Sequence, residues 1–240
     1  MELQSATAAS AVGRGLDAAL AIASAAVIAW GVLGLGWSVF TVMALFWFEN
    51  VVIGGFNVLR MLVSGIRMGP AGLVGACAMA AFFTLHYGLF TAVHGTFVVM
   101  MFGVAELGRE AMNGGLLPPV QRMLGHMMAD RDGWLAMLAI VVVQGVAFVR
   151  WSVETREQPA PLKELMGAPY GRVMILHITL IACGFLVMSL KAPVLGAILL
   201  VALKLGYDLV TLKRGPQQRR DPAAQGQASR VLVAGRRKPG

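Results

Sequence analysis

Long apolar runs constrain this sequence more than any other feature, because several could cross a membrane as helices. A helix needs about 20 apolar residues to span the roughly 30 Å hydrocarbon core of a bilayer. Only 13% of the residues are charged and 58% are hydrophobic, whereas a soluble domain has about 25% charged residues. The sequence therefore predicts an all-α integral membrane protein whose main partner is the lipid bilayer.

About six transmembrane helices in one bundle are predicted, and they form a domain over residues 16–213. The predicted helices are Leu16–Gly34, Trp37–Val63, Gly72–Gly103, Gly133–Val153, Gly171–Leu190 and Pro193–Leu212. The third is unusually long. At 1.5 Å per residue it would reach roughly 48 Å, so it must tilt, kink or project beyond the bilayer.

A short amphipathic helix is predicted in the third loop, which covers residues 104–132. Its apolar residues follow helical spacing, and they are Val120, Met123, Leu124, Met127 and Met128. Pro118 and Pro119 suit the start of this helix. We expect it to lie on the outer surface with its apolar stripe facing lipid. The methionines and His126 could also hold copper(I), but the stripe explains them without a metal.

The basic residues indicate how the helices are oriented, because Lys and Arg concentrate on the cytoplasmic side of a membrane. One side would hold Arg14, Arg60, Arg67, Arg150, Arg156, Lys163, Arg172 and the basic residues of the C-terminal tail. The other side would hold only Arg109, Arg122, Arg131 and Lys191. This distribution predicts a bacterial inner-membrane protein with both termini in the cytoplasm, and it explains the formal charge of +8 without nucleic acid.

The two ends of the chain lie outside the predicted bundle. Residues 1–15 form a short N-terminal segment, and residues 214–240 form a basic tail rich in Arg, Gln, Gly and Pro. Such a composition cannot bury a core, so we expect the tail to be disordered. Its basic residues could rest on anionic lipid headgroups, at roughly 1 kcal/mol for each residue near the surface.

Polar residues inside the predicted helices are the candidates for function. A charge at the centre of a bilayer costs roughly 2.5 to 3.5 kcal/mol and usually faces the interior of the bundle. The ionisable candidates for a metal site are Glu49, His86, His94, His177 and Asp208. The other polar residues within the predicted spans are Asn50, Asn57, Gln144 and Lys204.

The two histidines of HYGLFTAVHG cannot easily bind one ion together. His86 and His94 share a broad face of a helix, but they are about 12 Å apart along its axis. Metal ligands must lie only a few Å apart. We therefore expect His86 to lie deep in the bilayer and to face Glu49 across the bundle, whereas His94 lies nearer the outer boundary.

Carboxylates and imidazoles on several helices suit a divalent transition metal such as zinc or iron. A transporter or proton-coupled permease that uses Glu49 and His86 is the alternative, because imidazole titrates near neutral pH. Haem held by His86 or His94 together with His177 is a further alternative, as is a structural role in which these residues hydrogen-bond between helices. The familiar catalytic motifs of soluble enzymes are absent, so the sequence leaves open whether the protein is an enzyme.

Four stretches together resemble a prokaryotic multi-pass membrane family of unknown function, family 6498. They are FWFENVVIGGFNVLRM, HYGLFTAVHGTFV, RVMILHITL and LKLGYDL, and the resemblance covers roughly residues 20–212. It implies a six-helix membrane bundle and carries no activity or substrate.

Overall fold

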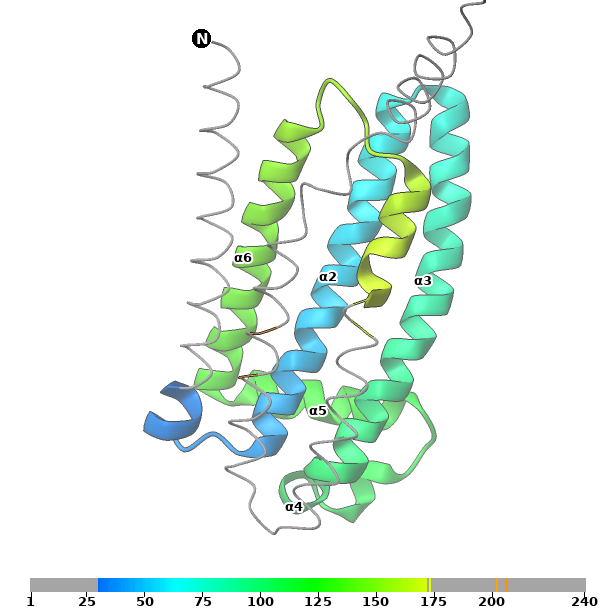
Figure 1. The fold of residues 1–240 in the computed structure, drawn as a ribbon. Helices are drawn as coiled ribbons and strands as arrows, with labels where there is room; N and C mark the ends of the chain where they lie inside the picture. The colour runs from blue at the N-terminus through cyan, green and yellow to red at the C-terminus, as the bar shows by residue number, and fades with distance from the viewer. Residues whose placement is uncertain (1–29, 172, 174–201, 203–205, 207–240) are drawn as a thin grey trace, which may run out of the picture. The chain divides into compact units, whose positions relative to one another are not determined.

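The computed structural model of the chain describes residues 30–171, together with residues 173, 202 and 206. Residues 30–171 and 173 belong to one compact unit, and the regular structure described there is helical (Figure 1). Its longer helices are α2 (Val39–Arg67), α3 (Pro70–Val98), α5 (Leu117–Ala129) and α6 (Arg131–Glu154). The N-terminal segment, the basic tail and most of the predicted first, fifth and sixth spans lie outside the described residues.

Within the part that the structure describes, three helices are long and apolar enough to cross a membrane. They are Val39–Arg67, Pro70–Leu107 and Arg131–Glu154, and they match the predicted second, third and fourth spans. The unusual length of the third is confirmed. It runs from α3 through a π-helical stretch, η1 (Val99–Gly103), into α4 (Val104–Leu107), and so ends beyond the predicted limit at Gly103.

A tight turn makes α2 and α3 an antiparallel hairpin. The α2 helix begins after Ser38, whose side chain caps it by accepting a hydrogen bond from the Thr41 N–H at 3.1 Å. It ends at Arg67, and Gly69 then adopts a φ of +86°, which favours glycine. Pro70 occupies the first turn of α3, where its missing N–H costs no helical hydrogen bond. The chain therefore reverses direction within two residues, Met68 and Gly69.

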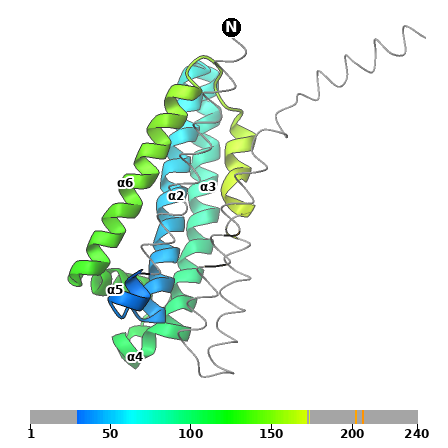
Figure 2. The ribbon, with the colours of Figure 1, turned by 60° about the vertical axis from the view of Figure 1, so that its left-hand side comes forward.

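The α2 helix lies between α3 and α6, as Figures 1 and 2 both show. The short α5 helix lies across one end of these three helices and contacts all of them. The amphipathic helix predicted in the third loop is therefore confirmed. Its stripe packs inward, however, because Val120, Met123 and Met127 are buried, and only Met128 of the predicted stripe is clearly exposed. Between α4 and α5 the chain forms one 3₁₀ turn, η2 (Arg109–Met112).

The connection after α6 differs from the prediction. A helix begins at residue 162 rather than at Gly171, and it lies against both α2 and α3 (Figure 1). Two buried side chains of α2 hold this segment through its backbone. The Asn57 Nδ2 donates to the Leu165 carbonyl at 2.8 Å, and the Ser64 Oγ donates to the Ala160 carbonyl at 2.6 Å. The apolar residues of this segment, Leu165 and Val173, join Met61 in a buried cluster.

Within the described residues, basic side chains lie at both ends of the long helices. The C-terminal ends of α2 and α6 lie together, because the Arg67 guanidinium donates to the Ser152 carbonyl at 2.9 Å and to Thr155 Oγ1 at 3.2 Å. This end also holds Arg60, whose guanidinium lies over the Trp151 ring, and Arg150, which is 3.4 Å from Glu154. The opposite end holds Arg109, Arg122 and Arg131.

Candidate functional site

Small residues let α2 and α3 approach closely along their whole length. The α3 residues that are buried are Ala76, Ala80, Phe83, Tyr87, Thr91, Gly95 and Val98, which recur every three or four positions and form one stripe. A Cβ at Gly65 would lie 2.3 Å from the Ala76 Cβ, and one at Gly54 would lie 2.5 Å from the Tyr87 ring. Glycine is therefore required at both positions for this helix packing.

Two hydrogen bonds fix the register of the hairpin in its central part. The Trp47 indole N–H donates to the Thr91 carbonyl at 2.7 Å, and the Tyr87 hydroxyl donates to the Asn50 carbonyl at 3.2 Å. This register places Glu49 at the height of α3 residues 87–91. Glu49 is therefore level with the middle of the segment that carries the two histidines.

Glu49 is buried about one third of the way along α2. Its residue is only 8% exposed, and it follows the start of α2 at Val39 by about 15 Å of helical rise. It does not lie on the side of α2 that faces α3. Gly54 and Trp47 contact α3, and Glu49 lies about 140° and 160° around the helix from them, respectively.

The neighbouring Asn50 is buried and incompletely hydrogen-bonded. The residue is 9% exposed, and its Nδ2 donates to the Phe46 carbonyl at 2.9 Å. Within the part of the chain that the structure describes, its Oδ1 has no hydrogen-bond partner. Leaving a buried acceptor unpaired costs about 1–3 kcal/mol, so the amide oxygen is an acceptor ready for a donor or a cation.

His86 is not where the sequence led us to expect it. The side chain is exposed, and its ring stacks on Phe82 at 5.6 Å and lies 5.9 Å from the Tyr170 ring. Burial raises the pKa of the Tyr170 hydroxyl, so this neighbour stays neutral. Tyr87, one residue further along, is the one that faces α2. Because successive helical residues are rotated by about 100°, the structure separates His86 from Glu49.

His94 is half-buried and held in one tautomer. Its Nδ1 lies 2.8 Å from the Phe90 carbonyl, and its ring packs against the Phe90 ring at 4.3 Å. A carbonyl only accepts, so Nδ1 is the donor in this contact. This is the arrangement common in metal-binding histidines, where the second nitrogen is oriented by a backbone carbonyl.

The remaining predicted site residues do not lie beside Glu49 and Asn50 in the part that the structure describes. Asn57 is buried and serves the packing of residues 162–171, and Gln144 is half-buried on α6. His177, Lys204 and Asp208 lie outside the described residues. Among residues that the structure describes, no three His, Cys, Asp or Glu side chains come close enough to hold a metal ion.

Sequence reasoning missed the hydrogen-bonding residues between α2 and α3. Trp47, Tyr87 and Thr91 lie within the apolar runs of the sequence, although they set the register of the hairpin. One signal was available. Tyr87 and Thr91 are four residues apart and share a face with Gly95, which marks the close-packed side of the helix.

Comparisons with known proteins identify a family and nothing more specific. A family model described as a family of unknown function, DUF6498, matches residues 7–225. No curated protein and no solved structure matches the chain.

Proposed function

The chain belongs to the DUF6498 family of unknown function, and we propose that it is a membrane-embedded protein that takes up protons or small cations beside Glu49 and Asn50. The observation that carries the proposal is the buried Asn50 Oδ1, which has no hydrogen-bond partner among the described residues and lies next to a buried carboxylate in the sequence. The corresponding functional class is a transporter or proton-coupled permease.

The side chains of Glu49 and Asn50 indicate what kind of ligand the site would bind. An ionisable residue inside a membrane is expensive to bury and usually marks an ion pathway or a proton relay. An amide oxygen and a carboxylate are both acceptors, and together they suit a proton carried on water or a small cation. The proposal assigns no role in this site to His86, which is exposed on another helix. The proposal therefore keeps the predicted transporter class, with Asn50 in place of His86 beside Glu49.

Proton movement in vesicles tests this function directly. We expect purified protein in liposomes, driven by an inside-negative potassium diffusion potential, to acidify the lumen as reported by a trapped pH-sensitive dye. Glu49→Gln keeps the shape of the side chain and removes its charge, so its rate should fall to that of protein-free vesicles.

The matched control is Glu154→Gln, which removes a carboxylate near the end of α6, where its side chain is 61% exposed. Its rate should equal that of the wild type. Equal rates for Glu49→Gln and the wild type would show that the Glu49 carboxylate does not carry protons. A wild type no faster than empty vesicles would refute proton transport by this chain.

A divalent metal is the second candidate, and the tautomer of His94 favours it. The Nδ1 contact with the Phe90 carbonyl orients the ring in the way that is common in metal-binding histidines. The other predicted ligands that this site would need, His177 and Asp208, lie outside the described residues. We expect His94→Ala to bind less zinc than the wild type, and His86→Ala to bind as much, because His86 lies exposed on α3.

Metal analysis of gently purified protein measures this difference, and the visible spectrum of the same sample tests haem. Wild-type protein without stoichiometric metal after zinc loading would contradict a resident metal site. Equal zinc in the wild type and His94→Ala would exclude His94 as a ligand.

A further inference from the structure

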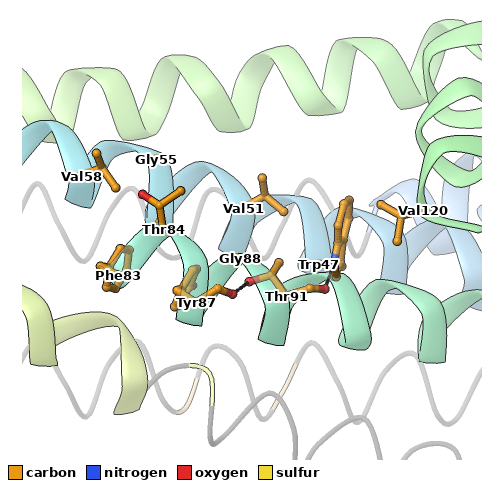
Figure 3. A pocket seen from close by; sticks show the side chains of 12 residues that line it. Trp47, Val51, Gly55, Val58, Phe83, Thr84, Tyr87, Gly88, Thr91 and Val120 are labelled. Carbon is orange, nitrogen blue, oxygen red and sulfur yellow. Dashed lines mark hydrogen bonds between the residues drawn. The ribbon is translucent and has the colours of Figure 1, made fainter. Parts of the chain in front are cut away.

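A groove runs between α2 and α3 on the side away from residues 162–171. It has a volume of about 260 Å³, and Figure 3 shows its side chains gathered along the two helices. The lining residues that matter most are Trp47, Val51 and Gly55 on α2, Thr84 and Gly88 on α3, and Val120 on α5. Val120 belongs to α5, the helix that crosses the ends of α2 and α3, so the groove reaches toward that end of the hairpin.

The polar groups in the groove wall are already satisfied by the protein. The Trp47 indole donates to the Thr91 carbonyl, and the Tyr87 hydroxyl donates to the Asn50 carbonyl. The hydroxyls of Thr84 and Thr91 donate to the carbonyls one turn earlier, at 2.8 Å and 2.7 Å. The donors on these four side chains are therefore already hydrogen-bonded within the protein, and the groove suits an occupant without polar atoms.

Two glycines keep the groove open. A Cβ built on Gly55 or on Gly88 would meet no atom of the described residues within 4 Å, whereas one built on Gly54 or Gly95 would collide with Tyr87 or Trp47. Gly54 and Gly95 are thus needed for packing, but packing alone does not require Gly55 and Gly88. The absent side chains leave the space in which an occupant could lie.

The surroundings of the groove identify that occupant. It lies in helices that are long and apolar enough to cross a membrane, and the exposed residues beside it include Val51, Leu85 and Leu89. The groove is therefore continuous with the surface that faces lipid. In a bilayer, a surface of this kind is in contact with the hydrocarbon chains of phospholipids. The apolar groove therefore suits one such chain.

We propose that the α2–α3 groove binds one acyl chain of a bilayer phospholipid, which enters sideways from the membrane and lies over Gly55 and Gly88. This site is separate from Glu49, because Val51 in the groove is about 160° around α2 from that carboxylate. The lipid site and the proton site can therefore fail independently.

Filling the groove tests the proposal. We expect wild-type protein from phosphatidylcholine vesicles to retain a phospholipid in native mass spectrometry, and the Gly55→Leu/Gly88→Leu double variant to lose it. In vesicles of phosphatidylcholine with brominated acyl chains, the Trp47 fluorescence should be quenched in the wild type and protected in the double variant. Trp47→Phe identifies the part of the emission that comes from this residue.

The matched control is Ala139→Leu, which adds the same side chain at an exposed position of α6 and should leave retention and quenching unchanged. Each single glycine variant is measured as well, in case the double variant does not fold, and each should lose part of the retained lipid. Equal retention and quenching in the wild type and the filled variants would overturn the proposal. A wild-type dimer that becomes monomeric in the double variant would also overturn it, in favour of a second copy at the groove.

Discussion

Replacing Gly65 by leucine should destabilise the α2–α3 hairpin more than any other single change near it. Even a methyl group at this position would lie 2.3 Å from the Ala76 Cβ, 3.0 Å from the Gly72 carbonyl oxygen and 3.2 Å from the Leu73 Cα. Two of these three atoms are backbone, so the helices would have to separate. Overpacking of this kind costs about 1–3 kcal/mol and sometimes more. A clear fall in the thermal unfolding midpoint in detergent, followed by tryptophan fluorescence, is the expected result.

Gly55 and Gly88 in the groove provide a control, because alanine there should not lower the thermal unfolding midpoint. Alanine is favoured over glycine inside a helix by about 1 kcal/mol. Gly55→Ala and Gly88→Ala meet no atom within 4 Å, so they should leave the midpoint unchanged or raise it. Gly65→Ala should lower it, because the collision outweighs the gain in helix propensity. A Gly65→Ala variant as stable as the Gly55→Ala variant would show that the two helices do not pack as described.

Replacing Asn57 by alanine should loosen the segment that crosses α2 and α3 after the end of α6. Asn57 is 1% exposed, and its amide donates to the Leu165 carbonyl of the helix over residues 162–171. Losing this buried hydrogen bond and the packing of the side chain should cost about 2 kcal/mol, or about a thirtyfold faster local opening. Hydrogen exchange measured on peptides from residues 160–171 should report that increase.

Asn113→Ala is the matched control, because Asn113 is exposed in the loop before α5 and lies at the opposite end of the helices. It should leave exchange in residues 160–171 unchanged. Ser64→Ala removes the neighbouring hydrogen bond to the Ala160 carbonyl, so it should act in the same direction as Asn57→Ala. Unchanged exchange in Asn57→Ala would mean that apolar packing alone holds this segment.

Three long helices and the amphipathic helix could be predicted because apolar patterns determine them locally. The predicted helix over Trp37–Val63 and the observed α2 (Val39–Arg67) share most of their length. Pro118 and Pro119 marked the start of α5 correctly. The helix over residues 162–171 was missed because its region contains Pro159, Pro161, Pro169 and several charges. Its burial depends on Met61 and Phe83, which are distant in the sequence.

The candidate site was predicted less well than the helices. Glu49 is buried, as expected for a charged residue inside a predicted span. Its predicted pairing with His86 was wrong. Spacing along a helix gives the angle between two of its own residues, but it does not say which face of one helix meets which face of another.

The sequence by itself determined which stretches are helical and apolar enough to cross a membrane, because helix formation and burial in lipid depend on local composition and length. Only the tertiary structure decided that α2 turns Trp47 and Gly54 toward α3 and Glu49 away from it. The physical reason is close packing: Gly65 and Gly54 permit contact on one face of α2 alone, and that contact fixes the rotation of the whole helix.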